Sequence, residues 1–342
     1  MSDPGEKPKR RPRYSGRNPR HFAQKYKERD PGRYPDTVAK VIASGKTPAG
    51  SHLPVLMDQC LAALALREGD VGIDATLGYG GHAARILEMI RPGGKLLGLD
   101  VDPLEQPKTA ARLRALGHDE NVFEAVRSNY AGIAKVLAER GIGGVDFVLA
   151  DLGCSSMQLD DPLRGFSFKA AGPLDMRMNP TRGLSAAEWL AKVSAAKLEV
   201  ALHEHADEPR AAAMAAGLAG RGFFNTMALA GAVRSLLAGL DEETIESTIR
   251  RVFQAVRIAV NEEFTALDAL LRVLPDCLKP GGRAVVLTFH SGEDRRVKKA
   301  FQAGLRAGVY AAISDGVVSA GPDERRLNPR SSSAKLRWAV KA

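Results

Sequence analysis

The chain has 342 residues, of which 44% are hydrophobic and 6% aromatic, and its 49 Lys and Arg against 40 Asp and Glu give a net charge of +9. This composition excludes a chain that is disordered throughout and a collagen-like fibre. Residues 1–50 hold 13 Lys and Arg against 5 Asp and Glu, a net charge of +8, which leaves +1 for the other 292 residues. A basic arm on a nearly neutral body indicates a polyanionic partner, either nucleic acid or an anionic membrane surface.

Cysteine and histidine usage argues against disulfide and metal sites. Cys60, Cys154 and Cys277 are odd in number and form no C-x-x-C pair, which fits a reducing compartment. His203 and His205 lie two apart on an expected helix, where their rings point in different directions, so we assign no metal. No apolar stretch approaches the ~18 residues of a membrane span, and the N-terminus lacks the apolar core of a signal peptide. We therefore expect a cytoplasmic protein without a membrane partner.

The sequence after the arm alternates between helical and strand patterns. A helix is expected to begin at Pro54, a residue suited to the first helical position. Strands are then expected at residues 71–75, 95–99, 121–126 and 145–149, with helices between them. A long helix at 247–274, a strand at 283–289 and a closing apolar segment at 334–341 follow near the C-terminus. Strands that alternate with helices indicate a parallel sheet covered on both faces.

The alternation stops between residues 160 and about 250. This segment is rich in alanine and its apolar residues repeat at helical spacing, which predicts a helical insertion. We therefore predict an α/β fold on a Rossmann-like sheet. Its parts are a basic, partly disordered arm (1–50), a ligand-binding α/β domain in two segments (51–159 and 251–342) and an inserted helical subdomain (160–250).

The first expected strand, its glycine loop and the acid after the second strand form the nucleotide-binding half of such a sheet. Gly78, Gly80 and Gly81 let the backbone approach a ligand closely. Asp100, 26 residues after Asp74, can accept hydrogen bonds from both hydroxyls of a ribose. The G-x-G-x-x-G pattern of dinucleotide sites is not met, which favours an adenosyl ligand without phosphates, such as S-adenosylmethionine. For the loop alone, a tight turn with a capping acid is an equal alternative.

Three further loops are candidate sites. The segment from Asp151 to Gln158 places a carboxylate, two hydroxyls and an amide at the end of the fourth strand. This position is beside the switch point where such sheets bind ligands. The alternative interpretation is an Asx turn followed by a capped helix. His290 follows the later strand, where it can also be a structural hydrogen-bonding group at a helix N-terminus. The segment 328–337 carries three basic residues suited to phosphate contacts, or forms a solvated loop; they are Arg330, Lys335 and Arg337.

Together these segments resemble the bacterial small-subunit rRNA (cytosine-N4)-methyltransferases, which use S-adenosylmethionine to methylate a cytidine of the ribosomal decoding centre. The matching stretches include Asp74-Ala-Thr-Leu-Gly-Tyr-Gly-Gly-His82 and Asp151-Leu-Gly-Cys-Ser-Ser-Met-Gln-Leu-Asp-Asp161. Others lie at residues 52–56, 100–103, 164–168, 172–180, 253–261, 289–291 and 328–337. The resemblance covers residues 52–342 and implies a class I methyltransferase sheet with a helical insertion that recognises the substrate.

The resemblance also implies the site residues. The implied cofactor contacts are Gly80, Gly81, His82, Asp100, Tyr130, Asp151 and Gln158. For methyl transfer to a cytosine amine, we expect Asp151 and Ser155, with the carbonyl of Leu152, to accept a hydrogen bond from the amine. His290 would orient the base or relay its proton, and the base must be single-stranded or flipped out. Candidate walls of the base pocket, which can equally be core residues, are Phe166, Phe168 and Met176.

The sequence departs from the family pattern in places. The arm lies outside it, Gly292 stands where leucine is usual, Ser332 stands where arginine is usual, and residues 203–252 lack two of the family's stretches. The expected partner is small-subunit ribosomal RNA or the assembled subunit, and a homodimer is left open. Two other classes are weighed: a nicotinamide-dependent oxidoreductase, which lacks its phosphate-side glycine here, and a methyltransferase-fold RNA-binding assembly factor with another methylation target or none.

Overall fold

The computed structural model describes residues 54–342, so the predicted arm at 1–50 lies outside the described residues. Seven strands form one sheet in the order β3-β2-β1-β4-β5-β7-β6. Their bounds are Val71–Asp74 (β1), Lys95–Asp100 (β2), Phe123–Arg127 (β3), Val145–Asp151 (β4), Leu278–Thr288 (β5), Tyr310–Ile313 (β6) and Lys335–Lys341 (β7). Strands β1 to β5 pair in parallel, and β7 is antiparallel to both neighbours. The predicted α/β fold with a parallel, Rossmann-like sheet is confirmed.

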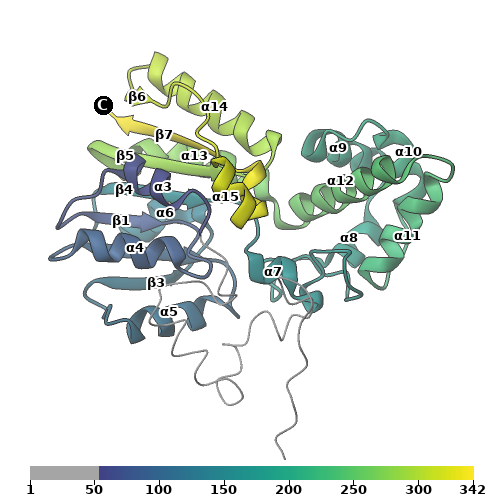
Figure 1. Cartoon of the computed structure of the whole chain (residues 1–342), viewed down its shortest axis with the longest axis horizontal. Helices are drawn as coiled ribbons and strands as arrows, with labels where there is room; N and C mark the ends of the chain where they lie inside the picture. Colours follow the sequence, from purple (N-terminus) through teal and green to yellow (C-terminus); the bar gives the residue numbers. More distant parts are fainter. Residues whose placement is uncertain (1–53) are drawn as a thin grey trace, which may run out of the picture.

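Helices cover both faces of the sheet (Figure 1). One face carries α3 (Met57–Leu64), α4 (Gly81–Ile90) and α5 (Gln106–Ala115), and the other carries α6 (Ile133–Ala138), α13 (Glu263–Cys277) and α14 (Ser291–Arg306). Strand β4 supplies both layers, because Phe147 and Leu149 pack with the first group while Val148 and Ala150 pack with the second. Successive side chains of a strand point to opposite faces, so a continuous apolar run marks a strand buried on both sides.

One glycine in the sheet is fixed by its neighbour on the next strand. Gly72 of β1 lies opposite Phe147 of β4, and a Cβ at Gly72 would come within 2.2 Å of the Phe147 ring. Any side chain at position 72 would therefore displace this ring from the core.

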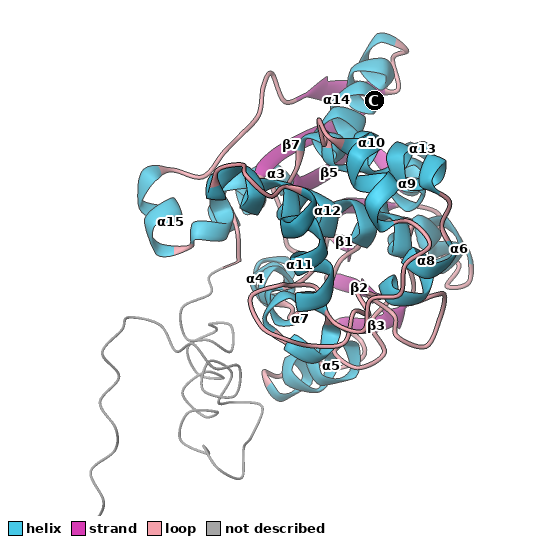
Figure 2. Cartoon of the chain, turned by 90° about the vertical axis from the view of Figure 1, so that its right-hand side faces the viewer, coloured by secondary structure: helices cyan, strands magenta, loops and turns pink. Residues whose placement is uncertain are grey.

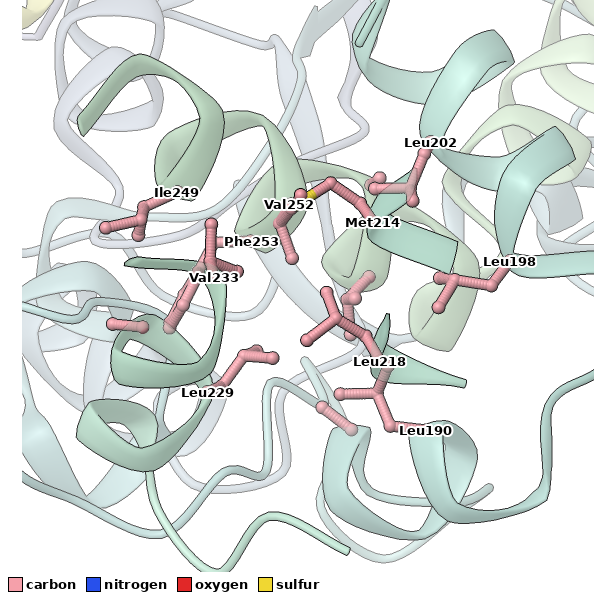
Figure 3. Close-up of a cluster of buried hydrophobic side chains, with 14 of the residues drawn as sticks. Leu190, Leu198, Leu202, Met214, Leu218, Leu229, Val233, Ile249, Val252 and Phe253 are labelled. Carbon is pink, nitrogen blue, oxygen red and sulfur yellow. The ribbon is translucent and has the colours of Figure 1, made fainter. Parts of the chain in front are cut away.

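A second lobe contains five helices with a hydrophobic core of their own. They are α8 (Ala186–Lys192), α9 (Ala195–Ala206), α10 (Ala211–Leu218), α11 (Thr226–Leu236) and α12 (Glu242–Asn261). Figure 3 shows Met214 and Leu218 of α10 between side chains of the neighbouring helices, and Figure 2 shows the lobe in front of the sheet. No strand forms within residues 160–250, all of which the structure describes. The boundaries at 160 and 250 stay predictions.

Two sequence expectations about elements were wrong, and one strand was not expected. The single helix expected at 247–274 is broken at Glu262, whose φ of 51° is left-handed, so α12 ends at Asn261 and α13 begins at Glu263. The first helix begins at Met57, after a left-handed Leu56, and not at Pro54. The short edge strand β6 was missed. Within residues 54–342, no helix combines the length and the apolar character that crossing a membrane requires.

Candidate active site

A cavity of about 380 Å³ opens at the carboxyl ends of β1, β2 and β4, bounded by the glycine loop, the start of α7 (Ser156–Asp160) and a loop of the helical lobe. Ser155 and Arg330 line it, and so do all of the predicted cofactor residues: Gly80, Gly81, His82, Asp100, Tyr130, Asp151 and Gln158. The fold therefore brings together residues that were selected from five separate segments of the sequence. The individual roles of these residues stay predictions.

Two backbone amides hold the carboxylate of Asp100. The N–H of Gly78 donates to Asp100 Oδ2 at 2.8 Å, and the N–H of Asp102 donates to Oδ1 at 2.8 Å. Burial raises the pKa of Asp100 to about 6, although these hydrogen bonds act in the opposite direction. The result is a carboxylate of fixed orientation that faces the cavity beside the glycine loop.

Packing, as well as ligand approach, requires the glycines of this loop. Gly80 has a φ of 75°, and a Cβ there would lie 2.9 Å from Thr109 Cγ2. A Cβ at Gly81 would lie 2.4 Å from Pro54 Cγ. Because Pro54 also lines the cavity, a side chain at Gly81 would alter both the packing of α4 and the cavity wall. The sequence left ligand approach and a tight turn as explanations of these glycines, and the contacts with Thr109 and Pro54 add a third.

Asp151 is the least restrained carboxylate of the cavity. Its side chain is 28% exposed, and its backbone N–H donates to Thr76 Oγ1 at 2.6 Å. Burial raises the pKa of Asp151 to about 8, and repulsion from Asp74 and Glu293 acts in the same direction. Within residues 54–342, no hydrogen bond to the Asp151 carboxylate is found, so its lone pairs are available to a ligand.

His82 lies beside Asp151 as a neutral ring. Its Nε2 is 3.1 Å from the carbonyl oxygen of Val55, and its Nδ1 is 3.6 Å from Asp151 Oδ2. Burial lowers the pKa of His82 to about 4. The imidazole is therefore uncharged at neutral pH, and it provides no positive charge that would lower the pKa of Asp151.

Gln158 is engaged by the protein at both ends of its amide. Ser155 and Gln158 form a capping box at the start of α7, in which Gln158 Oε1 accepts from the Ser155 N–H at 3.0 Å. Its Nε2 donates to Asp102 Oδ2 at 2.9 Å. Ser155 Oγ accepts from the Gln158 N–H at 3.2 Å, which leaves the hydroxyl proton available to a ligand.

The structure does not place His290 in the cavity. Its Nδ1 accepts from the N–H of Glu293 at 3.4 Å and so caps α14, and its ring lies 5.6 Å from the Phe264 ring, centroid to centroid. The preceding residue, Phe289, lines the cavity instead. Phe264 also leaves no room for a side chain at position 292, because a Cβ at Gly292 would come within 2.5 Å of Phe264 Cζ.

The three basic candidates separate into one residue at the cavity and two away from it. Arg330 lines the cavity and donates to Asp160 Oδ1 at 2.6 Å. Arg337 is 8% exposed and donates to Asp294 Oδ1 at 2.6 Å, and Lys335 Nζ is 3.6 Å from the same carboxylate. Arg337 is therefore occupied by an internal ion pair, which leaves Arg330 as the candidate nearest the site.

Other residues form the side of the cavity next to the helical lobe. Phe166 and Met176 are buried in the core of that lobe, and Phe168 packs against it, which matches the alternative weighed for them. Met178 and Asn261 line the cavity instead. Neither was predicted from the sequence, although both lie in stretches that resemble the family, 172–180 and 253–261. Within the described residues, no cluster of three or more His, Cys, Asp or Glu side chains could hold a metal ion.

A glycine loop after β1 and an acid after β2, at the switch point of a parallel sheet, define a Rossmann-like enzyme with an adenosyl-type site. A family model described as the MraW methylase family matches residues 49–342, and the chain belongs to that family. It is an S-adenosylmethionine-dependent methyltransferase.

Relatives of this chain are named as ribosomal RNA methyltransferases. "Ribosomal RNA small subunit methyltransferase H 1" of Lachnoclostridium phytofermentans is 46% identical over 98% of this chain and 93% of its own length. "Ribosomal RNA small subunit methyltransferase H 2" of Alkaliphilus metalliredigens is 44% identical over the full length of both chains. A solved structure described as a putative rRNA-methylase from Clostridium thermocellum has a TM-score of 0.43 and 12% identity, covering 85% of this chain and 100% of that one. The fold assignment rests on the sheet order and not on that similarity.

The expectation that the arm lies outside the family pattern agrees with the family model, although some relatives align with the arm. The family model begins at residue 49, and "Ribosomal RNA small subunit methyltransferase H" of Acidobacterium capsulatum, 40% identical, covers only 85% of this chain although 98% of its own length is matched. Relatives that align over 98% to 100% of this chain must include most of residues 1–50. The arm is therefore shared with some relatives and is not peculiar to this chain.

Proposed function

We propose that this protein transfers the methyl group of S-adenosylmethionine to the N4 amine of a cytidine in small-subunit ribosomal RNA, in the cytoplasm. The observation that carries the proposal is the Asp151 carboxylate, which faces the cavity at the end of β4 with its lone pairs available. The relatives' names support ribosomal RNA of the small subunit as the substrate. The resemblance of the Asp151 segment to the cytosine-N4 family supports cytidine as the target.

The residues of the cavity fit the cofactor. The sulfonium of S-adenosylmethionine supplies an activated methyl group and a positive charge. The carboxyl groups at the ends of three neighbouring strands, Asp74, Asp100 and Asp151, suit this charge, because a bound cation beside them favours their ionised forms. Asp100 would hold the ribose, because its two oxygens are fixed in orientation by backbone amides, and Tyr130 would form part of the wall at the adenine.

Asp151 would act on the amine. The nitrogen of a cytosine amine is a weak nucleophile because its lone pair is delocalised into the ring. A carboxylate that accepts a hydrogen bond from N4–H turns the lone pair toward the methyl group and takes up the proton that the nitrogen loses when the new bond forms. An aspartate whose pKa is raised to about 8 is a stronger base for this step than an ordinary aspartate. Ser155, whose hydroxyl proton is available, would donate to a ring acceptor of the base.

Nucleoside analysis of the product tests this proposal. The full-length protein is incubated with labelled S-adenosylmethionine and small subunits that lack the modification, and the RNA is digested for mass spectrometry. We expect N4-methylcytidine, with free ribosomal RNA as the comparison substrate. Another methylated nucleoside would overturn the assignment of the base, and the absence of label in any ribosomal particle would overturn the ribosomal substrate. A homodimer stays a prediction that light scattering of the same preparation tests.

A further inference from the structure

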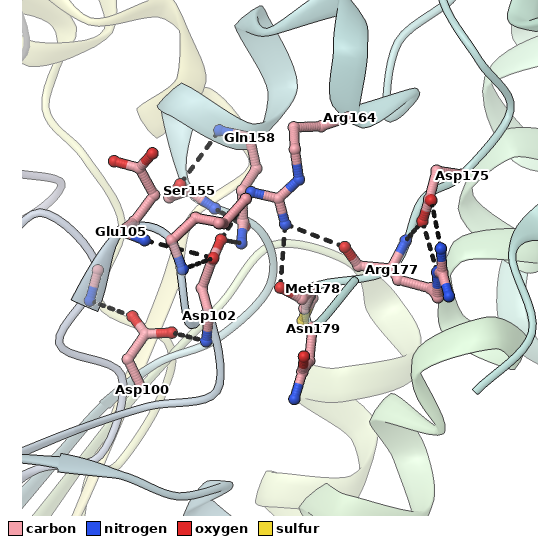
Figure 4. A network of polar contacts seen from close by, with 12 residues as sticks. Asp100, Asp102, Glu105, Ser155, Gln158, Arg164, Asp175, Arg177, Met178 and Asn179 are labelled. Atoms are coloured by element: carbon pink, nitrogen blue, oxygen red, sulfur yellow. Dashed lines mark hydrogen bonds and ion pairs between the residues drawn. The ribbon is translucent and has the colours of Figure 1, made fainter. Parts of the chain in front are cut away.

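A buried arginine joins the cofactor side of the cavity to the loop of the helical lobe. Arg164 is 9% exposed and lies between the two lobes (Figure 4). Its Nη1 donates to Asp102 Oδ2 at 2.7 Å, while its Nη2 donates to the carbonyls of Arg177 at 3.0 Å and Met178 at 2.9 Å. The planar guanidinium therefore holds three acceptors from two segments in fixed positions.

On the cofactor side, Arg164 acts on the segment that orients Asp100. Asp102 is 1% exposed, and its backbone N–H is one of the two donors to the Asp100 carboxylate. The other oxygen of Asp102, Oδ1, accepts from the N–H groups of Leu104 at 2.9 Å and Glu105 at 3.3 Å. Movement of Asp102 would therefore displace a hydrogen-bond donor of the acid that we assign to the cofactor.

On the substrate side, Arg164 acts on a loop that a second, partly buried side chain also holds. The N–H of Met178 donates to Asn261 Oδ1 at 2.7 Å, and Asn261 Nδ2 donates to the carbonyl of Met176 at 2.8 Å. Met176 has a φ of 60°, a left-handed conformation that a non-glycine residue adopts only when its surroundings enforce it. Both polar backbone groups of Met178 are thus fixed, and its side chain lines the cavity.

We propose that Arg164 is a positioning residue that couples the two ligands, so that the cofactor and ribosomal RNA each strengthen the binding of the other. Asp102 is the carboxylate partner found for Arg164 in the described chain, and separating them would leave a buried charge unpaired. A ligand that fixes Asp102 on the cofactor side also favours the ordered position of the Met178 loop on the substrate side, because Arg164 bonds to both. The converse holds for a ligand that fixes the loop. By linkage, the factor by which the cofactor tightens RNA binding equals the factor by which RNA tightens cofactor binding. The inference rests on the proposed function, since RNA is the second ligand.

The coupling factor is measured directly. The dissociation constant of unmodified small subunits is determined with and without saturating S-adenosylhomocysteine, for the wild type and for Arg164→Met. We expect a wild-type factor within the range of about 5- to 150-fold that is typical of coupled sites. In Arg164→Met this factor falls toward one, a change that a general loss of stability would not produce in the folded fraction.

Arg177→Met is the matched control. The Arg177 side chain pairs with Asp175 in the same loop, and only its backbone carbonyl contacts Arg164, so the wild-type factor is expected to be kept. If Arg164→Met does not fold, Arg164→Lys keeps the positive charge but lacks the planar fork, and its factor should lie below that of the wild type. A wild-type factor of one, or an unchanged factor in the Arg164 variant that folds, overturns the inference. Failure of the wild type to methylate the subunits would instead overturn the proposed function.

Discussion

Three aspartates at neighbouring strand ends differ in the hydrogen bonds that they accept. Asp100 accepts two backbone N–H bonds and has a pKa raised to about 6. Asp74 accepts from the N–H of Thr76 at 3.1 Å and has a pKa raised to about 7. Asp151, whose carboxylate accepts no hydrogen bond from the described residues, has a pKa raised to about 8. Burial raises all three pKa values, and hydrogen bonds to the ionised form limit the rise, in keeping with the proposed roles of Asp100 in binding and Asp151 as a base.

This difference predicts the pH dependence of methyl transfer. If Asp151 acts in its ionised form, the single-turnover rate rises with pH through the pKa of that group. Asp74→Asn removes a negative charge that helps to raise the pKa of Asp151, while Oδ1 is retained to accept from the N–H of Thr76. The rise in rate should therefore shift to lower pH in this variant, and Asp151→Asn should lose most of the rate at every pH. A profile in Asp74→Asn that coincides with the wild type would contradict the coupling between the two carboxylates.

At the scale of single elements, His290 is the N-cap residue of α14. The ring caps α14, and the next residue, Ser291, donates from Oγ to Asp207 Oδ2 of the helical lobe at 2.7 Å. Arg295, one turn further along α14, approaches the same carboxylate at 3.5 Å. The segment that was predicted to act on the base therefore lies at a joint between the two lobes.

His290→Asn separates a capping role from a proton-relay role. Asparagine is a good N-cap residue, so its side-chain oxygen can accept from the N–H of Glu293, whereas His290→Ala loses the cap at a cost of about 1 kcal/mol. We expect the asparagine variant to keep the methyl-transfer rate of the folded protein, with a small fall in Tm from the lost contact with Phe264. A large loss of rate at an unchanged Tm would instead support the relay role.

The sequence predicted those features of the site that depend on short, continuous segments of the chain. Each of Gly80, Asp100 and Asp151 stands at the end of an expected strand or in the loop after it, and all three line one cavity; their roles stay predictions. Contacts between distant residues could not be predicted in this way. The ion pair of Arg164 and Asp102 spans 62 positions. The left-handed break at Glu262 follows Asn261, whose amide oxygen accepts from the N–H of Met178, 83 positions earlier.

At the scale of the whole molecule, two lobes with separate cores meet at the cavity. The core of the helical lobe includes residues of α12, and the cores on the two faces of the sheet include residues of α13 and α4. The cavity takes its lining from both lobes, because Met178 and Asn261 line it together with the strand ends of the sheet. A change in the angle between the lobes would therefore change the cavity, while each core could stay intact.

The uneven distribution of net charge along the chain predicts that the arm at 1–50 contributes to RNA binding independently of the two lobes. Residues 1–50 carry a net charge of +8 and the other 292 residues only +1, so we expect the arm to provide most of the attraction to a phosphate backbone. Deletion of residues 1–45 should weaken the binding of small subunits and reduce the slope of log K against log salt, by about 0.7 for each lost phosphate contact of single-stranded RNA. We expect the affinity for S-adenosylhomocysteine to stay the same, since residues of the described chain, 54–342, line its site. A variant of full length in which glutamines replace the lysines and arginines of the arm should behave like the deletion, because the effect depends on charge. If the salt slope of either variant equals that of the wild type, the arm does not contact the RNA phosphates.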